Sequence, residues 1–162
     1  MTHLAGNRLV NKDDKRILFR GKLDSLQALF VLNQALFAEM GEEKELLEDL
    51  EDILASLREM MRCDVLGEPF ERKTIIGLTH EELRDHSHHP MKYYKVKQMV
   101  LPSYTLGKTY AMLNQMRTAV RETEVTAAAA FHNGRSFARY LHIMMCIALD
   151  IRFSSSMISP RS

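Results

Sequence analysis

One long segment of mostly apolar residues, from Ile17 to Met40, constrains the fold of this chain most strongly. Its apolar side chains fall on most sides of a helix, which predicts a helix at the centre of a bundle or at a subunit interface. Acidic residues just before it, between Lys12 and Arg16, stand where the helix dipole favours negative charge. With four prolines in 162 residues and few alternating β-branched runs, the sequence predicts an all-α fold.

Four further helices are predicted at residues 42–64, from Thr79 to about Asp85, from near Tyr104 onward, and at residues 135–153. Gly67, close to a proline, ends the first of these, and Thr79 with Glu82 forms the capping box that begins the second. We therefore expect an up-down bundle of about five helices that forms a single domain, residues 1–153. The composition of residues 154–162 is typical of a flexible tail.

The charge balance argues against a nucleic-acid protein that relies on overall basicity, because 22 basic residues are nearly matched by 21 acidic ones. No segment reaches the roughly 18 apolar residues of a membrane span, and the N-terminus lacks the apolar region of a signal peptide. The cysteines, Cys63 and Cys146, lack the spacing of zinc sites or disulfide frameworks. We expect a cytoplasmic protein with buried, reduced thiols, no nucleic-acid partner and no membrane association.

A stripe of charge lies within the segment from Leu113 to Phe131. Arg117, Arg121 and Glu124 are spaced i, i+4 and i+7, so they project from one side of a helix. Two arginines one turn apart repel each other by roughly a few tenths of a kcal/mol, and burying one unpaired would cost several kcal/mol. An anionic group should therefore lie opposite them: a carboxylate elsewhere in the chain, a phosphate ligand, or both.

Small residues form a second row, because Gly21, Ala28 and Ala35 recur at intervals of seven. Such a row permits the close approach of another helix or of a ligand, and tight helix packing is its more ordinary explanation. Asp24 falls in this row between apolar flanks, which argue against a purely solvent-facing role.

Histidines gather in a third feature, His86, His88 and His89, followed by a proline and two tyrosines. Three imidazoles could ligate a transition metal, but structural zinc sites draw their ligands from two separated pairs, and this sequence has no second pair. We therefore assign no metal site here and expect a rigid loop that lines a ligand site.

Four short motifs occur in the order found in one enzyme family: Thr2 with Leu4, residues Val10 to Asp14, Gly21 with Asp24, and Arg121 with Glu124. They are similar to its Thr-Thr-Ser-Leu phosphate loop, Val-x-Lys-Asp-Asp stretch, Tyr-Gly-x-Val-Asp-Glu-Leu helix and Arg-Arg-Ala-Glu-Arg helix. The segments MRCDVLGEP, IIGLTHEEL, LRDHSHHPMKYY and RTAVRETEVTAAAAF narrow the match further. Up to about Phe131 the sequence resembles ATP:cob(I)alamin adenosyltransferase of the ethanolamine-utilisation type, which is related to the propanediol-utilisation type. That family's N-terminal extension with a His and paired-Cys metal motif is not found in this sequence.

The resemblance implies transfer of the 5′-deoxyadenosyl group from ATP to the cobalt of reduced cobalamin, making adenosylcobalamin for ethanolamine catabolism, with Mg²⁺ on the phosphates. Asp24 and Arg121 would be the catalytic residues, and we expect a buried ion pair between them across two helices beneath the cobalamin. The cofactor-binding residues would be Thr2, Lys12, Arg117, Glu124, His142 and Met99.

The individual roles implied by the resemblance differ among these residues. Thr2 and Lys12 would hold the phosphates, Arg117 would be a structural or phosphate-facing neighbour, and Met99 would line the corrin site. His142 stands where the broader family has an asparagine.

The resemblance also implies a homotrimer with the ATP site between subunits, and it leaves open an association with a bacterial microcompartment. A different class of function remains open on the residues alone: a non-catalytic helical protein that binds cobalamin or a nucleotide as a sensor, carrier or scaffold partner. Residues 121–125 contain one arginine where the related motif has three, which favours this alternative. The enzyme is favoured by the retention of Lys12, Asp24, Arg121 and Glu124.

Overall fold

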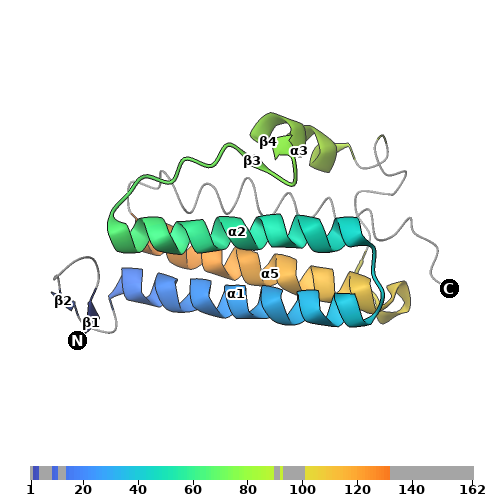
Figure 1. Ribbon diagram of the computed structural model, residues 1–162, viewed down its shortest axis with the longest axis horizontal. Coiled ribbons are helices and arrows are strands. Elements are labelled where there is room, and N and C mark those ends of the chain that lie inside the picture. Colours follow the sequence, from blue (N-terminus) through green and yellow to red (C-terminus); the bar gives the residue numbers. More distant parts are fainter. Residues whose placement is uncertain (1, 4–8, 11–13, 90–91, 93–100, 132–162) are drawn as a thin grey trace.

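Three long helices form the body of the protein (Figure 1). The computed structural model describes residues 2–3, 9–10, 14–89, 92 and 101–131. The long helices are α1 (Lys15–Glu39), α2 (Lys44–Leu66) and α5 (Lys108–Ala130), and the short ones are α3 (His80–His88) and the 3₁₀ turn η1 (Tyr104–Leu106). Two antiparallel hairpins pair β1 (Thr2–His3) with β2 (Leu9–Val10), and β3 (Thr74–Ile75) with β4 (Leu78–Thr79). The prediction of an all-α fold is confirmed, because each strand is only two residues long.

Contacts at the two ends of the bundle fix the directions of the long helices. At one end the rings of Phe19 and Phe131 meet edge to face with centroids 5.5 Å apart, so α1 begins where α5 ends. At the other end Thr109, near the start of α5, donates a hydrogen bond to Glu42 in the turn between α1 and α2. α1 is therefore antiparallel to both neighbours, and α5 runs parallel to α2. Residues 67–88, which include β3, β4 and α3, run back along α2 from its end (Figure 1), and the parallel order of α2 and α5 departs from strict up-down alternation.

Local capping signals explain where several helices begin and end. The Asp14 carboxylate accepts a hydrogen bond of 2.9 Å from the backbone of Arg16 and so caps α1. Gly67 ends α2 in the left-handed conformation, with φ of 72°. The predicted capping box of Thr79 and Glu82 is confirmed at the start of α3.

The histidine segment differs from its prediction as a loop. α3 continues beyond the expected end near Asp85, so His86 and His88 lie in its last turn. Nothing between the capping box and Pro90 interrupts the helix, and the histidines suit its C-terminal end, where positive charge is favoured. Residues 90, 91, 93 and 94 of this segment lie outside the described residues.

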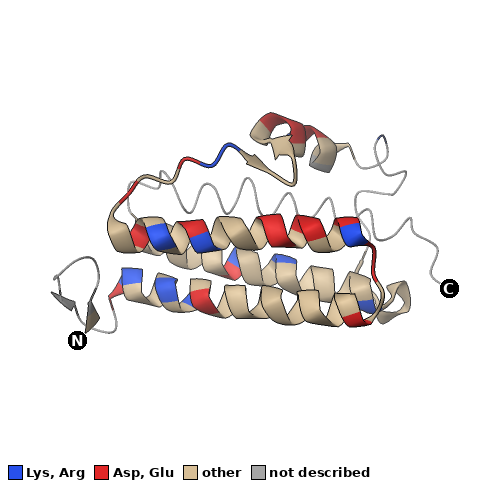
Figure 2. Ribbon diagram, viewed as in Figure 1, with Lys and Arg blue, Asp and Glu red and all other residues tan. Residues whose placement is uncertain are grey.

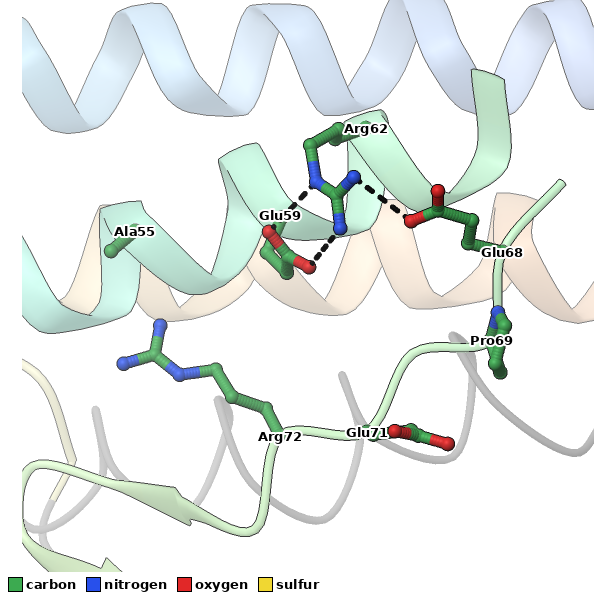
Figure 3. Close-up of a pocket in the computed structure, with 7 residues that line it drawn as sticks. All are labelled: Ala55, Glu59, Arg62, Glu68, Pro69, Glu71 and Arg72. Atoms are coloured by element: carbon green, nitrogen blue, oxygen red, sulfur yellow. Dashed lines mark hydrogen bonds and ion pairs between the residues drawn. The ribbon is translucent and has the colours of Figure 1, made fainter. Parts of the chain in front are cut away.

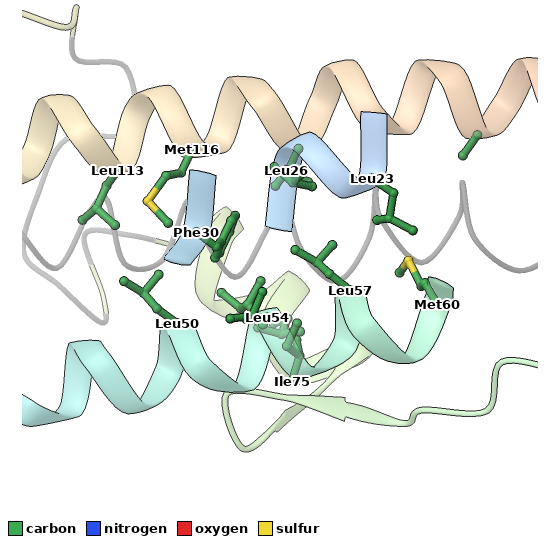
Figure 4. Close-up of a cluster of buried hydrophobic side chains, with 14 of the residues drawn as sticks. Leu23, Leu26, Phe30, Leu50, Leu54, Leu57, Met60, Ile75, Leu113 and Met116 are labelled. Atoms are coloured by element: carbon green, nitrogen blue, oxygen red, sulfur yellow. The ribbon is translucent and has the colours of Figure 1, made fainter. Parts of the chain in front are cut away.

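The hydrophobic core lies between the three long helices (Figure 4). Its buried side chains include Leu23, Leu26 and Phe30 of α1, Leu50, Leu54, Leu57 and Met60 of α2, Leu113 and Met116 of α5, and Ile75 of β3. Complete burial of one such side chain contributes about 1.5–3 kcal/mol. The core uses only one side of α1, since Leu18, Val31 and Leu32 remain 55%, 48% and 56% exposed.

The β3–β4 hairpin is anchored to α2 by a polar cluster. The Asp52 carboxylate accepts hydrogen bonds from the Arg72 guanidinium and, at 2.6 Å, from the backbone N–H of Ile76. Arg72 also donates to Ser56 Oγ at 2.6 Å. Ile76 and Gly77 have φ of 49° and 77°, the left-handed pair that a two-residue hairpin turn requires. The sequence predicted only an extended piece here, because an isoleucine at the first turn position is an uncommon signal.

Some predictions fall on residues that the structure does not describe. These are the helix at 135–153, the tail at 154–162 and the environment of Cys146. Within the described ranges, no helix is long and apolar enough to cross a membrane.

Candidate functional site

Asp24 and Arg121, the residues expected to form a buried catalytic ion pair, are both exposed, Asp24 on α1 and Arg121 on α5. No ion pair joins them in the described part of the chain, so the expectation is wrong for a single chain. The reason is helical periodicity. Leu23 and Leu26 take the core-facing positions of α1, as Val120 does on α5, which turns the intervening charged positions outward.

A different ion pair, between Lys22 and Glu122, joins α1 to α5. Lys22 Nζ lies 2.8 Å from Glu122 Oε2, and these residues stand two positions from Asp24 and one from Arg121. Both side chains are exposed, and such pairs contribute about 0–1 kcal/mol. Figure 2 shows that the charges of α1 gather in its first turns, while most of its second half carries none.

Arg117 and Glu124 lie half-buried on α5 on either side of exposed Arg121. Arg117 donates from Nε and Nη2 to Oδ1 of Asn114, at 3.2 and 2.8 Å, so its guanidinium is held against its own helix. The predicted line of three charges is therefore present on α5, with its middle member the most accessible.

The other predicted binding residues are less completely described. Thr2 lies half-buried in β1, where it pairs with Val10 of β2. Lys12, Met99 and His142 lie outside the described residues. Among the described residues, no three His, Cys, Asp or Glu side chains gather to form a metal site.

Gly21 has no packing role that the described chain explains. A Cβ placed on it would meet no heavy atom within 4 Å outside its own helix. Glycine inside a helix costs roughly 0.5–1 kcal/mol relative to alanine, so its presence needs another reason. It belongs to an exposed stripe along α1, which we call the outer α1 stripe: Leu18, Gly21, Ser25, Ala28, Leu32 and Ala35. Val125 of α5 adds a further exposed apolar side chain, 64% accessible.

A buried charge cluster that sequence reasoning missed lies at the end of the bundle where α1 begins. Asp64, near the end of α2, has a side chain only 1% exposed. Its Oδ1 lies 2.7 Å from Arg16 Nη2 and its Oδ2 lies 2.5 Å from Arg20 Nε. Arg16 also lies over the ring of Phe131, with its Cζ 5.6 Å from the centroid. The signal was available, because Arg16 and Arg20 are one helical turn apart and require an anion, as Arg117 and Arg121 do.

An open pocket of about 660 Å³ lies elsewhere, between α2 and the segment that follows it (Figure 3). It is lined by Ala55, Glu59, Arg62, Glu68, Pro69, Glu71 and Arg72. Arg62 pairs with Glu59 at 2.8 Å and with Glu68 at 2.9 Å, and its hydrogen bond lowers the pKa of the Glu59 carboxyl. No predicted catalytic or binding residue lines this pocket, and its paired charges identify no ligand.

Cys63 is buried, as predicted. Burial raises the pKa of this thiol, and its hydrogen bond to Glu59 acts in the same direction. A thiol with a raised pKa is a poor nucleophile at neutral pH, so Cys63 is a structural residue.

Comparison with known proteins identifies the family. Residues 1–145 match the family model described as cobalamin adenosyltransferase. Over 131 residues, or 81% of this chain, the sequence is 41% identical to corrinoid adenosyltransferase EutT of Escherichia coli (strain K12) and 40% identical to that of Salmonella typhimurium (strain LT2). The chain spans about half the length of these relatives, 47% in each case. No solved structure matches the chain. Because the family model covers most of the sequence, the chain belongs to the cobalamin adenosyltransferase family.

Proposed function

We propose that this chain transfers the 5′-deoxyadenosyl group from ATP to the cobalt of reduced cobalamin, and that the adenosylcobalamin serves ethanolamine catabolism. Membership of the family supports this reaction, and the relatives named corrinoid adenosyltransferase EutT support its use in ethanolamine utilisation. The structural observation that carries the proposal is the exposure of Asp24 on α1, one turn after Gly21, and of Arg121 on the neighbouring helix α5. These side chains are open to a ligand or to a second subunit.

The reaction makes limited chemical demands on the protein. Cobalt(I) is a strong nucleophile, so its electron pair forms the bond to C5′ of ATP while the C5′–O bond breaks and triphosphate leaves. The protein must hold C5′ in line with the cobalt, neutralise the leaving triphosphate and exclude water.

We assign these tasks to the residues that resemble the family's motifs. Thr2 and Lys12 hold the triphosphate together with Mg²⁺, at the start of α1, where the helix dipole favours an anion. Asp24 and Arg121 lie at the reacting face.

The remaining predicted residues surround that face. Arg117 and Glu124 flank Arg121 on α5, and we assign them to the nucleotide side. Met99 and His142 are assigned to the corrin side.

A homotrimer is part of the same proposal, with the outer α1 stripe buried against a second subunit. The stripe supports this because Leu18 and Leu32 are more than half exposed, and because Gly21 leaves room for a close approach. In such an assembly Asp24 and Arg121 would become buried and would find their partners across the interface. The proposal places the protein in the cytoplasm and leaves open its association with a bacterial microcompartment.

The alternative is a protein that binds cobalamin or a nucleotide without catalysis. It is favoured by Glu122 and exposed Val125, which stand where the related motif has arginines that could contact triphosphate.

One experiment separates the two functions. The chain is mixed with ATP, Mg²⁺ and chemically reduced cobalamin, and the corrin spectrum is followed before and after illumination. The proposed enzyme forms a light-sensitive cobalt–carbon bond in an ATP-dependent manner. A spectral change without that bond would support the non-catalytic alternative.

A further inference from the structure

The carboxylate of Asp64 is almost completely enclosed by two arginines of α1. One oxygen pairs with Arg16 at 2.7 Å and the other with Arg20 at 2.5 Å. The Nη2 atoms of both arginines also donate to the backbone oxygen of Asp64, at 3.4 and 3.2 Å. A single residue at the end of α2 therefore fixes both guanidinium groups, which are planar and hold their geometry once paired.

Stabilisation of α2 does not explain an aspartate at this position. The C-terminal end of a helix carries partial negative charge, so a carboxylate in its last turn is unfavourable on its own. The arginines need the carboxylate instead, because two positive charges one turn apart on α1 repel each other. We call these three residues the Asp64 clamp. The formal charges of Arg16, Arg20 and Asp64 sum to +1, so one positive charge is not balanced within the clamp.

The surplus charge lies at the end of the bundle that carries the N-terminal hairpin. The strand β2 ends at Val10, five residues before α1 begins at Lys15, and the pairs of Asp64 with Arg16 and Arg20 place the end of α2 beside the start of α1. Arg16 is the more accessible arginine of the clamp, with a side chain 26% exposed against 13% for Arg20. Its Nε is buried and has no hydrogen-bond partner among the described residues. The Arg16 guanidinium is thus fixed by Asp64 and Phe131, while the exposed part of its side chain remains accessible to a ligand.

We propose that Asp64 is a positioning residue for the nucleotide site: it holds Arg16 and Arg20 so that their surplus positive charge stabilises the triphosphate of ATP. This inference rests on the proposed function, because it takes ATP as the substrate. Asp64 itself does not touch the substrate. Its contribution is to fix the arginines before the triphosphate arrives, which removes the cost of ordering them on binding.

The substitution Asp64→Asn distinguishes positioning from simple charge attraction, because the two predict opposite changes in triphosphate affinity. Replacing Asp64 with Asn removes a negative charge near the anion, so Coulomb attraction alone would tighten triphosphate binding. If the clamp positions the arginines, the same substitution weakens binding, because Asn offers one acceptor oxygen instead of two and no charge.

The test measures binding of inorganic triphosphate with Mg²⁺ to the 162-residue chain by calorimetry, well below the unfolding temperature. We expect Asp64→Asn to weaken binding about ten-fold, equivalent to about 1.4 kcal/mol. In steady-state adenosylation, the KM for ATP should rise by a similar factor while the KM for cobalamin stays the same. The matched control is Glu68→Gln, which removes a half-exposed carboxylate just beyond the end of α2 and should leave affinity within about two-fold.

A second variant keeps the test decisive if Asp64→Asn does not fold. Arg16→Gln leaves the pair of Arg20 and Asp64 intact and should also weaken triphosphate binding about ten-fold. Its control is Arg62→Gln, an equal change of charge on the surface of α2.

Unchanged or tighter binding by Asp64→Asn or Arg16→Gln would overturn the inference, as would failure of the unmodified chain to bind triphosphate. If triphosphate binds and both variants weaken it while no cobalt–carbon bond forms, the clamp is supported. The proposed function would then be wrong.

Discussion

Arg20 and Asp64 form an ion pair, with Nε and Oδ2 2.5 Å apart, that joins the second turn of α1 to the last turn of α2. The Asp64 side chain is 1% exposed, so its charge depends on Arg20 and Arg16 for compensation. Removing one partner of a buried pair leaves the other charged groups without compensation, and this costs more than the pair itself contributes. Two arginines one turn apart on α1 thus bind a carboxylate of α2, and this contact holds the two helices together.

Truncation of the clamp should destabilise the fold. We expect Asp64→Ala to lower the free energy of unfolding by about 3 kcal/mol, since it leaves two guanidinium groups close together and partly desolvated. Chemical denaturation at fixed protein concentration measures the change. Lys44→Ala serves as the control, because Lys44 and Glu48 are exposed and their pair contributes about 0.5 kcal/mol or less. If Asp64→Ala and Lys44→Ala lowered the free energy of unfolding equally, the clamp would not stabilise the fold.

Gly21→Ala should separate the stability of the chain from its assembly. An added Cβ meets no described atom outside the helix, so helix propensity should raise the stability of the isolated chain by about 0.5–1 kcal/mol. The same methyl group should weaken self-association, which analytical ultracentrifugation measures. Ser25→Ala, on the same outer α1 stripe, adds no atom at Cβ and should leave association unchanged. Undiminished association of Gly21→Ala would argue that the stripe is not an interface.

The β3–β4 hairpin should depend on Asp52. Asp52→Ala removes the acceptor of the Ile76 N–H and of Arg72, and we expect a loss of about 1–3 kcal/mol. Amide exchange should accelerate at residues 72–79 while the core of α1 stays protected. Glu51→Ala, at the next position, removes only exposed contacts and is the control. If amide exchange accelerated equally along the whole chain, the hairpin would not unfold independently of the helices.

Cys63 should remain protonated and unreactive in the folded protein. Burial raises the pKa of its thiol above the ordinary value of 9.0, so the folded state retains a proton that the unfolded state releases at alkaline pH. Stability is therefore unaffected at lower pH and falls as the pH rises above about 9. In a Cys146→Ser background, a thiol reagent at pH 8 should modify Cys63 at the rate of unfolding. Rapid modification without unfolding would contradict burial.

Local sequence signals predicted the elements well, because they act within one helix. The apolar spacing of residues 17–40, the Gly67 stop and the capping box of Thr79 and Glu82 each correspond to an observed helix or helix end. The direction of α5, parallel to α2, was not predictable in this way, since no signal within one helix fixes how two helices are oriented relative to each other.

The candidate site was harder to predict, because burial depends on which side of each helix meets a partner. Asp24 lies among apolar neighbours in sequence, yet those neighbours divide between the core and an exposed stripe. The sequence analysis expected an anion opposite Arg117 and Arg121. The structure instead has a carboxylate between Arg16 and Arg20. Asp64 comes from a different helix, and no spacing rule within one helix could identify it.

The outer face of α1 is where the account of function is tested most directly. Asp24→Asn removes the charge proposed for the reacting face and keeps the size of the side chain, while the exposed Glu39→Gln serves as a matched control on the same helix. Neither substitution should change the fold, because both side chains are exposed in the single chain.

The decisive measurement is the rate of ATP-dependent cobalt–carbon bond formation, followed through the corrin spectrum, for the unmodified chain and these two variants. We predict adenosylation by the unmodified chain and by Glu39→Gln, and a loss of about 100-fold or more in Asp24→Asn, as for removal of an electrostatic contact at a reacting centre. Unchanged turnover and unchanged cobalamin affinity in Asp24→Asn would contradict this prediction.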